Sequence, residues 1–150
     1  MPSQELIFVI LLIIFKNAVE IGLHRQGNSW KFTPDEVDLR RRVFWTSYAI
    51  ELTAAFNLGR PPSISDEHID APFPSEIPET AMALHHIRHR QTQSKILAKI
   101  YCSPDRLMDL DEVQKYEILC DIQSDLDIWA KNLPEIHARS KTPYPLRFVI

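Results

Sequence analysis

The chain has 150 residues, 45% of them hydrophobic and 25% charged, and a formal net charge of −3. A chain of this length buries about 70% of its unfolded surface, so it needs no disulfide or metal to fold. The acidic balance argues against a domain that holds DNA by neutralising phosphates, and two cysteines exclude a zinc cluster within these residues. Three glycines against eleven prolines favour helices punctuated by proline over hairpins or phosphate-binding loops.

The amino-terminal segment is the hardest to interpret. Residues 6–15 form an unbroken apolar run, which is half the roughly 20 residues that a membrane span needs. It has the length of a signal-peptide core, but no Lys or Arg precedes it and Lys16-Asn17-Ala18 is a poor cleavage context. A buried helix or strand is favoured, while a signal or anchor and a segment not native to the fold stay open. We leave residues 1–15 unassigned.

The remainder predicts an all-α fold of about four helices, over residues 16–25, 34–58, 79–102 and 109–133. The second helix has the strongest boundary signals. Thr33 and Glu36 can form a capping box around Pro34, while Gly59 and Pro61 end the helix. Five prolines make residues 59–78 an extended segment, with Ser65 capping a single turn and Ile64, Ile69 and Phe73 packing on the helices.

Helical periodicity predicts which faces are buried. Helix 34–58 buries an aromatic stripe that includes Phe44, Trp45 and Tyr48, and Arg41 within that stripe is expected to have a carboxylate partner. Helix 79–102 has a thin apolar face and should lie at the surface. Helix 109–133 has a fuller stripe, composed of Tyr116, Leu119, Ile122, Leu126, Trp129 and Leu133. The apolar end of the chain suggests a domain that is incomplete at its carboxyl end.

The residue patterns do not predict an enzyme. His85 and His89 share a helical face, but the residue beside the first histidine is His86 where a zincin has glutamate, so a solvated face is favoured over a metal site. Cys102 and Cys120 are expected to be small core residues. A small metal enzyme that uses the histidines stays as an alternative. We predict no catalytic, cofactor-binding or metal-binding residue in this chain.

A specific resemblance begins at Ala18. AVEIGLHR, FTPDEVDLRRRVFWTSYAIE and LGRPPSISDEHIDAPFP follow one another over residues 18–74, and LDIWAKNLP at 126–134 fits less sharply. This pattern resembles the fungal-specific transcription factor domain, the regulatory region of fungal binuclear zinc-cluster regulators. The matching family-motif residues, which we expect to be structural, are Gly22, Leu23, His24, Arg25, Arg40, Arg41, Arg42, Phe44, Trp45, Gly59, Arg60, Pro61, Asp70 and Pro74.

The resemblance implies that residues 16–150 are part of a regulatory domain that controls transcription in the nucleus. DNA and zinc would be bound only by a cluster that this chain lacks, and the partners would be proteins or other parts of the full-length regulator. A small effector is possible, and no membrane is implied. The alternative is a helical protein-interaction module unrelated to transcription.

Some motif residues also have a physical interpretation of their own. Gly22 suits either a close helix contact or a helix end, whereas His24 and Arg25 suit packing and hydrogen bonding. We expect Arg60 to pair with Asp66 or Asp70. One departure matters: the family usually has Asp-Arg where this chain has Glu51 and Leu52, so an ion pair there must be rewired or lost.

Overall fold

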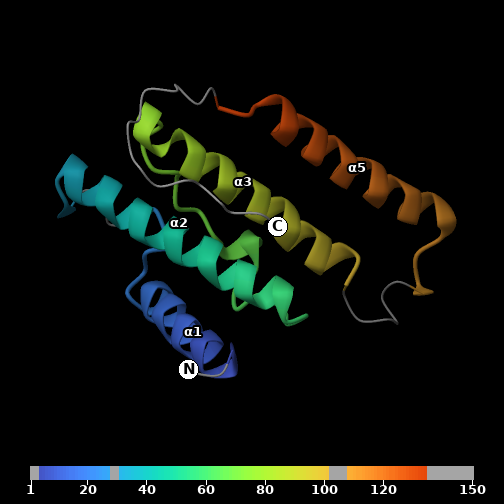
Figure 1. The fold of residues 1–150 in the computed structure, drawn as a ribbon, viewed down its shortest axis with the longest axis horizontal. Coiled ribbons are helices and arrows are strands. Elements are labelled where there is room, and N and C mark those ends of the chain that lie inside the picture. The colour runs from blue at the N-terminus through green and yellow to red at the C-terminus, as the bar shows by residue number, and fades with distance from the viewer. Residues whose placement is uncertain (1–3, 28–30, 102–107, 135–150) are drawn as a thin grey trace.

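The structure is a computed structural model that describes residues 4–27, 31–101 and 108–134. Within these ranges it is all-α, as predicted, and contains no strand. The elements are α1 (Gln4–Glu20), α2 (Pro34–Asn57), the short 3₁₀ turn η2 (Asp66–His68), α3 (Pro78–Lys99) and α5 (Glu112–Lys131) (Figure 1). None of the described helices is long and apolar enough to span a membrane.

The four helices lie side by side in chain order. α1 packs on α2, α2 on α3, and α3 on α5 (Figure 1). The segment between α2 and α3, which we call the strap (residues 59–77), crosses this arrangement and includes η2. Because each helix packs mainly on its neighbours in the chain, α1 and α5 form the two edges.

The apolar run at the amino terminus is helical. It forms most of α1, so the expected helix at 16–25 has the wrong bounds. α1 ends at Glu20 because Gly22 adopts a φ of 75°, and Leu23 N–H donates to Ala18 O at 3.0 Å. Nothing lies within 4 Å of a Cβ built on Gly22. This glycine therefore serves the helix end and not a close helix contact.

Local signals set both ends of α2, as predicted. The Glu36 carboxylate accepts from Thr33 N–H at 2.8 Å, and Thr33 Oγ1 accepts from Glu36 N–H at 3.4 Å. At the other end Gly59 has a φ of 62°, and Arg60 N–H donates to Ala55 O at 2.9 Å. The carboxyl-terminal ends of α1 and α2 are thus both closed by a glycine in the left-handed conformation.

The core lies where α1, α2, α3 and the strap meet. Phe15, Phe44 and Leu52 are fully buried there. Trp45 is 3% exposed, which confirms the prediction that it lies in the core. The Trp45 indole donates its N–H to Pro72 O at 3.0 Å. Partly buried side chains of the strap pack on this core at the three predicted positions, Ile64, Ile69 and Phe73.

The expectation that the third helix lies at the surface was wrong. α3 lies between α2 and α5, and buries Leu84 and Ile87 together with polar residues. Its apolar face looked thin because His85, Thr92 and Ser94 share the buried side. A pattern that counts only apolar residues misses polar side chains that a neighbouring helix covers.

The prediction that the apolar stripe of the last helix is buried was largely wrong. α5 begins after Asp111, which caps it, and ends at Lys131. Of the predicted stripe only Ile122 is buried, whereas Tyr116 is 68% exposed. Cys120 is exposed and not a core residue. The cause is that α5 packs mainly on α3 among the described helices. Cys102 and the apolar end of the chain lie outside the described residues.

Candidate functional site

Two family motifs that are far apart in the chain meet at the turn after α1. The backbone carbonyl of His24 accepts from the N–H groups of Asp70 and Ala71, each at 3.1 Å. The Asp70 carboxylate lies 3.4 Å from Arg25 Nε and accepts from Gln26 N–H at 2.7 Å. Arg25 takes part through its side chain, whereas His24 takes part through its backbone carbonyl, and the buried Nδ1 of its ring has no hydrogen-bond partner among the described residues. These contacts fix the strap against the end of α1, where Leu23 and Pro74 are also buried.

The three consecutive arginines of α2 make different contacts, as expected, but the one paired with a carboxylate is not the one predicted. Arg42, and not Arg41, pairs with Asp38 at 3.0 Å, because these residues lie one turn apart on α2. Arg40 places its guanidinium 4.4 Å from the centroid of the Phe32 ring. The arginines therefore do not form one basic patch.

The predicted pairing of Arg60 was also wrong. Its guanidinium lies 4.6 Å from the centroid of the Phe8 ring on α1, while the neighbouring Pro61 is exposed. Asp66 instead accepts from the Tyr48 hydroxyl at 2.8 Å. The apolar segment whose fold was left open thus supplies the ring that Arg60 covers.

Glu51 rewires the position where the family usually has an aspartate. The side chain is 2% exposed and accepts from Ser63 Oγ at 2.7 Å and from Ser63 N–H at 3.1 Å. Burial raises the pKa of Glu51, and the bonds from Ser63 oppose that rise. Leu52 is fully buried in the core. The usual ion pair is replaced by a bond that holds the start of the strap on α2.

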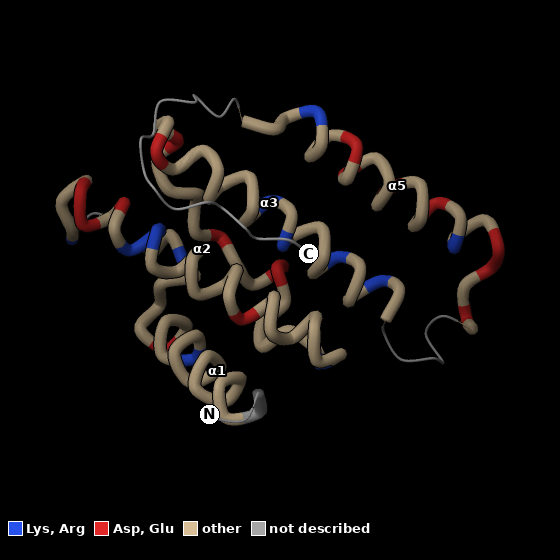
Figure 2. Tube along the Cα trace, viewed as in Figure 1, with Lys and Arg blue, Asp and Glu red and all other residues tan. Residues whose placement is uncertain are grey.

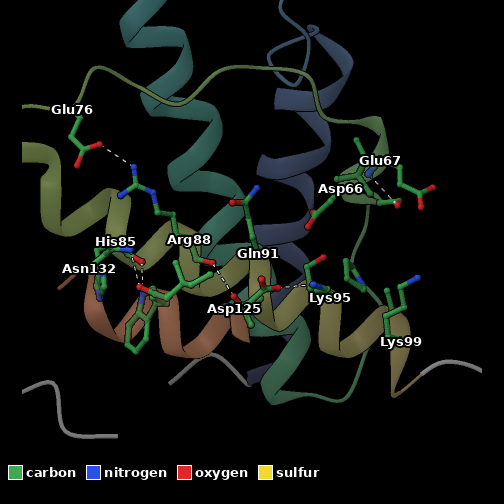
Figure 3. Close-up of a pocket in the computed structure, with 18 residues that line it drawn as sticks. Asp66, Glu67, Glu76, His85, Arg88, Gln91, Lys95, Lys99, Asp125 and Asn132 are labelled. Atoms are coloured by element: carbon green, nitrogen blue, oxygen red, sulfur yellow. Dashed lines mark hydrogen bonds and ion pairs between the residues drawn. The ribbon is translucent and has the colours of Figure 1, made fainter. Parts of the chain in front are cut away.

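A hollow of about 1000 Å³ lies between α3, α5 and the strap. We call it the α3–α5 pocket. Figure 3 shows acidic side chains reaching toward basic ones across it. Arg88 pairs with Glu76 of the strap at 2.9 Å. Lys95 lies 2.6 Å from Asp125 and 2.7 Å from Asp121, both on α5.

The apolar part of this pocket comes from Pro62, Ile64, Ala98, Ile128 and Trp129. Its walls therefore combine a hydrophobic surface with charged groups on both sides, a composition typical of sites for small molecules. Arg88 with Glu76 and Lys95 with Asp125 form ion pairs in its wall, so a charged ligand that binds at either position would replace one side of an existing pair.

The histidine cluster is not a solvated face, contrary to prediction. His85 is 2% exposed, and its ring stacks on the Trp129 indole at 4.5 Å between centroids. The His89 ring contacts the same indole at 4.7 Å. Neither ring nitrogen of His85 has a hydrogen-bond partner. Burial lowers the pKa of both His85 and His89, so the neutral rings are favoured.

In the described residues, no three His, Cys, Asp or Glu side chains are placed to hold a metal ion. Sequence reasoning found the histidines but not their role, since their partner lies 44 residues away from His85. The sequence contained one signal of this contact, which is Trp129 on the predicted stripe of α5. A tryptophan that packs against another helix needs a hydrogen-bond acceptor for its indole N–H.

Comparison with known proteins agrees with these motifs. The family model for the fungal specific transcription factor domain matches residues 3–137, a range that includes the apolar segment of α1. An uncharacterized transcriptional regulatory protein of Schizosaccharomyces pombe is 28% identical over 88% of this chain and 17% of its own length.

Two further relatives have names that state a direction of control. The transcriptional activator protein acu-15 of Neurospora crassa is 26% identical over 77% of this chain and 14% of its own length. The negative regulator of pleiotropic drug resistance STB5 of Candida glabrata is 28% identical over 91% of this chain and 14% of its own length. The chain thus spans less than a fifth of these curated relatives. No solved structure shows significant similarity to it.

The contacts of Asp70 and Ala71 with His24 and Arg25 hold the strap on the end of α1, and the family match covers nearly all of the helical scaffold. The chain belongs to the fungal specific transcription factor domain family and is a regulatory portion of a fungal transcription regulator.

Proposed function

We propose that this portion regulates transcription in the nucleus without catalysis, by contacts with proteins or with other parts of the full-length regulator. The names of the relatives support a role in transcription, and DNA contact would come from a separate zinc-cluster domain. The packing roles of the motif residues support a scaffold. A direction of control does not follow, since one relative is named an activator and another a negative regulator.

We further propose that a small effector binds in the α3–α5 pocket and thereby changes how α5 packs on α3. The observation that supports this is the pocket itself, which places ion pairs and the Trp129 indole around one hollow of about 1000 Å³. A ligand that displaces the Lys95–Asp125 pair would bind one arrangement of α5 better than another. Such differential affinity is what an effector needs to shift an equilibrium.

A reporter assay tests the regulatory role. The chain is fused to a bacterial repressor's DNA-binding domain and expressed in yeast with a matching promoter. We expect reporter output to differ from that of the DNA-binding domain alone, in either direction. The matched control is Trp45→Ala, which removes the buried indole and should abolish the effect at equal protein level. Identical output from the fusion and the bare DNA-binding domain would contradict the proposal.

A binding experiment tests the pocket separately. Free amino acids, succinate and benzoate serve as probes, and indole and amide NMR signals are the readout. We expect at least one probe to shift Trp129 and Lys95 signals in the unaltered chain and not in Ala98→Trp, which fills the pocket from an exposed position. Shifts that persist in Ala98→Trp, or no shifts at all, would contradict an effector site here.

The absence of catalysis needs its own measurement. If the histidines served a metal enzyme, the purified chain would contain a stoichiometric metal that His85→Ala and His89→Ala lose. We expect a chain without bound metal, because the ring of His85 is covered by Trp129.

A further inference from the structure

The outer surface shared by α1 and α2 is apolar and is covered by nothing in the described residues. On α1, Ile7, Ile10 and Ile14 are each between 45% and 52% exposed. On α2, Leu39, Val43 and Ile50 are exposed to a similar degree. We call these residues, together with Thr46, the α1–α2 face. A helix with apolar residues on all sides is normally buried on all sides. α1 packs on α2, and no described segment covers its other side (Figure 1).

The two stripes of this face enclose a groove of about 390 Å³. Leu11 and Ile14 of α1 and Val43 and Ile50 of α2 line the groove, together with Arg42, Thr46 and Ser47 of α2. That arginine already pairs with Asp38. Between Glu5 near its start and Lys16 and Glu20 near its end, α1 has no charged residue (Figure 2). Apart from Arg42, which is paired with Asp38, the residues that line the groove carry no charge.

The face is complementary to itself when reversed. The α2 stripe has spacings of four, three and four residues, from Leu39 through Val43 and Thr46 to Ile50. An antiparallel copy therefore places Leu39 against Ile50 of the partner subunit and Val43 against Thr46 of the partner subunit. An interface with twofold symmetry requires a patch that matches itself in this way. The α1 stripe of Ile7, Ile10 and Ile14 has spacings of three and four and lies beside it.

The area of the α1–α2 face indicates how strongly two copies would associate. α1 is about 25 Å long at 1.5 Å per residue, and two helices about 10 Å apart make a face about 20 Å wide. Each copy would then cover about 500 Å², a total of about 1,000 Å², which is at the lower limit for a specific interface.

We propose that two copies of this chain associate through the α1–α2 face, in an antiparallel arrangement in which four helices, two from each copy, share an apolar core. The dimer is weak and reversible because its area is small. This inference does not depend on the α3–α5 pocket, because that pocket involves α3 and α5 and the α1–α2 face involves neither of them.

Sedimentation velocity of the full chain tests the proposal, from low micromolar to near millimolar concentration. We expect a mass of 17.5 kDa at the low end and twice that mass at the high end. Ile10→Glu and Val43→Glu should each weaken association roughly tenfold or more, since each buries a charge in the core. The matched control is Leu119→Glu, which changes an equally exposed leucine on α5 and should leave association unchanged. Circular dichroism verifies that each variant keeps its helices.

A charge-pair experiment tests the register. Leu39→Lys and Ile50→Glu should each weaken the dimer, and the double variant should recover association because Lys and Glu then face each other across the interface. Within one helix these positions lie about 16 Å apart, too far to pair. A monomer at every concentration, equal weakening by Leu119→Glu, or a double variant no stronger than the single ones would each overturn the proposal.

Discussion

The Trp129 indole and His85 are joined twice. Their rings stack with centroids 4.5 Å apart, and the indole donates its N–H to the backbone carbonyl of His85 at 2.9 Å. The contact joins α5 to α3 near the α3–α5 pocket, so the position of α5 depends on it. Lys95 with its two aspartates provides the other polar connection between these helices.

Trp129→Ala should therefore release α5 from α3 while the rest of the fold persists. We expect a loss of roughly 2–3 kcal/mol in the free energy of unfolding, less than for a fully buried tryptophan because Trp129 is half-buried. Urea denaturation measures the loss, and amide exchange should show reduced protection in α5 and not in α2. Tyr116→Ala, an exposed aromatic on the same helix, should cost less than about 0.5 kcal/mol. Equal losses would contradict this prediction.

Acidification should weaken the same contact. Burial lowers the pKa of His85 and His89 in the folded chain, so as pH falls the unfolded chain takes up protons first. Their contribution to stability is full above about pH 6.5 and is lost as pH falls through the folded pKa values. His85→Phe combined with His89→Phe should flatten the stability profile below that pH. His86→Phe, an exposed neighbour, serves as the control, and an unchanged slope in the double variant would disprove the assignment.

The effect of Glu51 on the pH dependence of stability should be opposite to that of the histidines. Burial raises its pKa, so its contribution is full below the unfolded value of about 4.3 and is lost as pH rises through the folded pKa. Glu51→Gln removes the charge and keeps an oxygen for the bonds from Ser63. We expect it to stabilise the chain at neutral pH, because no charge then has to be buried. That gain should shrink in acid. Ser63→Ala, which removes one donor, should destabilise instead. Thermal unfolding across pH measures both effects.

Gly59→Ala tests the geometry that ends α2. The φ of 62° disfavours any side chain, so we expect a loss of about 1 kcal/mol even though the surrounding space is open. Gly27→Ala, where no positive φ is required, should change the free energy of unfolding by less than about 0.5 kcal/mol. Similar values for the two variants would argue against the left-handed helix end.

Features that depend on a few neighbouring residues could be predicted from the sequence. The capping box at Thr33, the end of α2 at Gly59 and the turn capped by Ser65 all appear where expected, because their hydrogen bonds join residues close in the chain. The burial of Trp45 also followed from the periodicity of one helix. The family motifs also marked the strap and the turn after α1, but the bonds that join the two, such as those from Asp70 and Ala71 N–H to His24 O, connect distant parts of the chain.

Partners that are distant in the chain required the tertiary structure. Arg60 covers Phe8 and not an aspartate, and His85 is buried under Trp129, because the packing of neighbouring helices decides which side chains meet. The same reason explains α3, whose polar residues Thr92 and Ser94 became interior only when α2 and α5 were placed on either side of it. The sequence by itself determined where α2 begins and ends, since those boundaries depend on local bonds. Only the tertiary structure decided which polar groups are buried, since burial depends on what the rest of the chain places next to them.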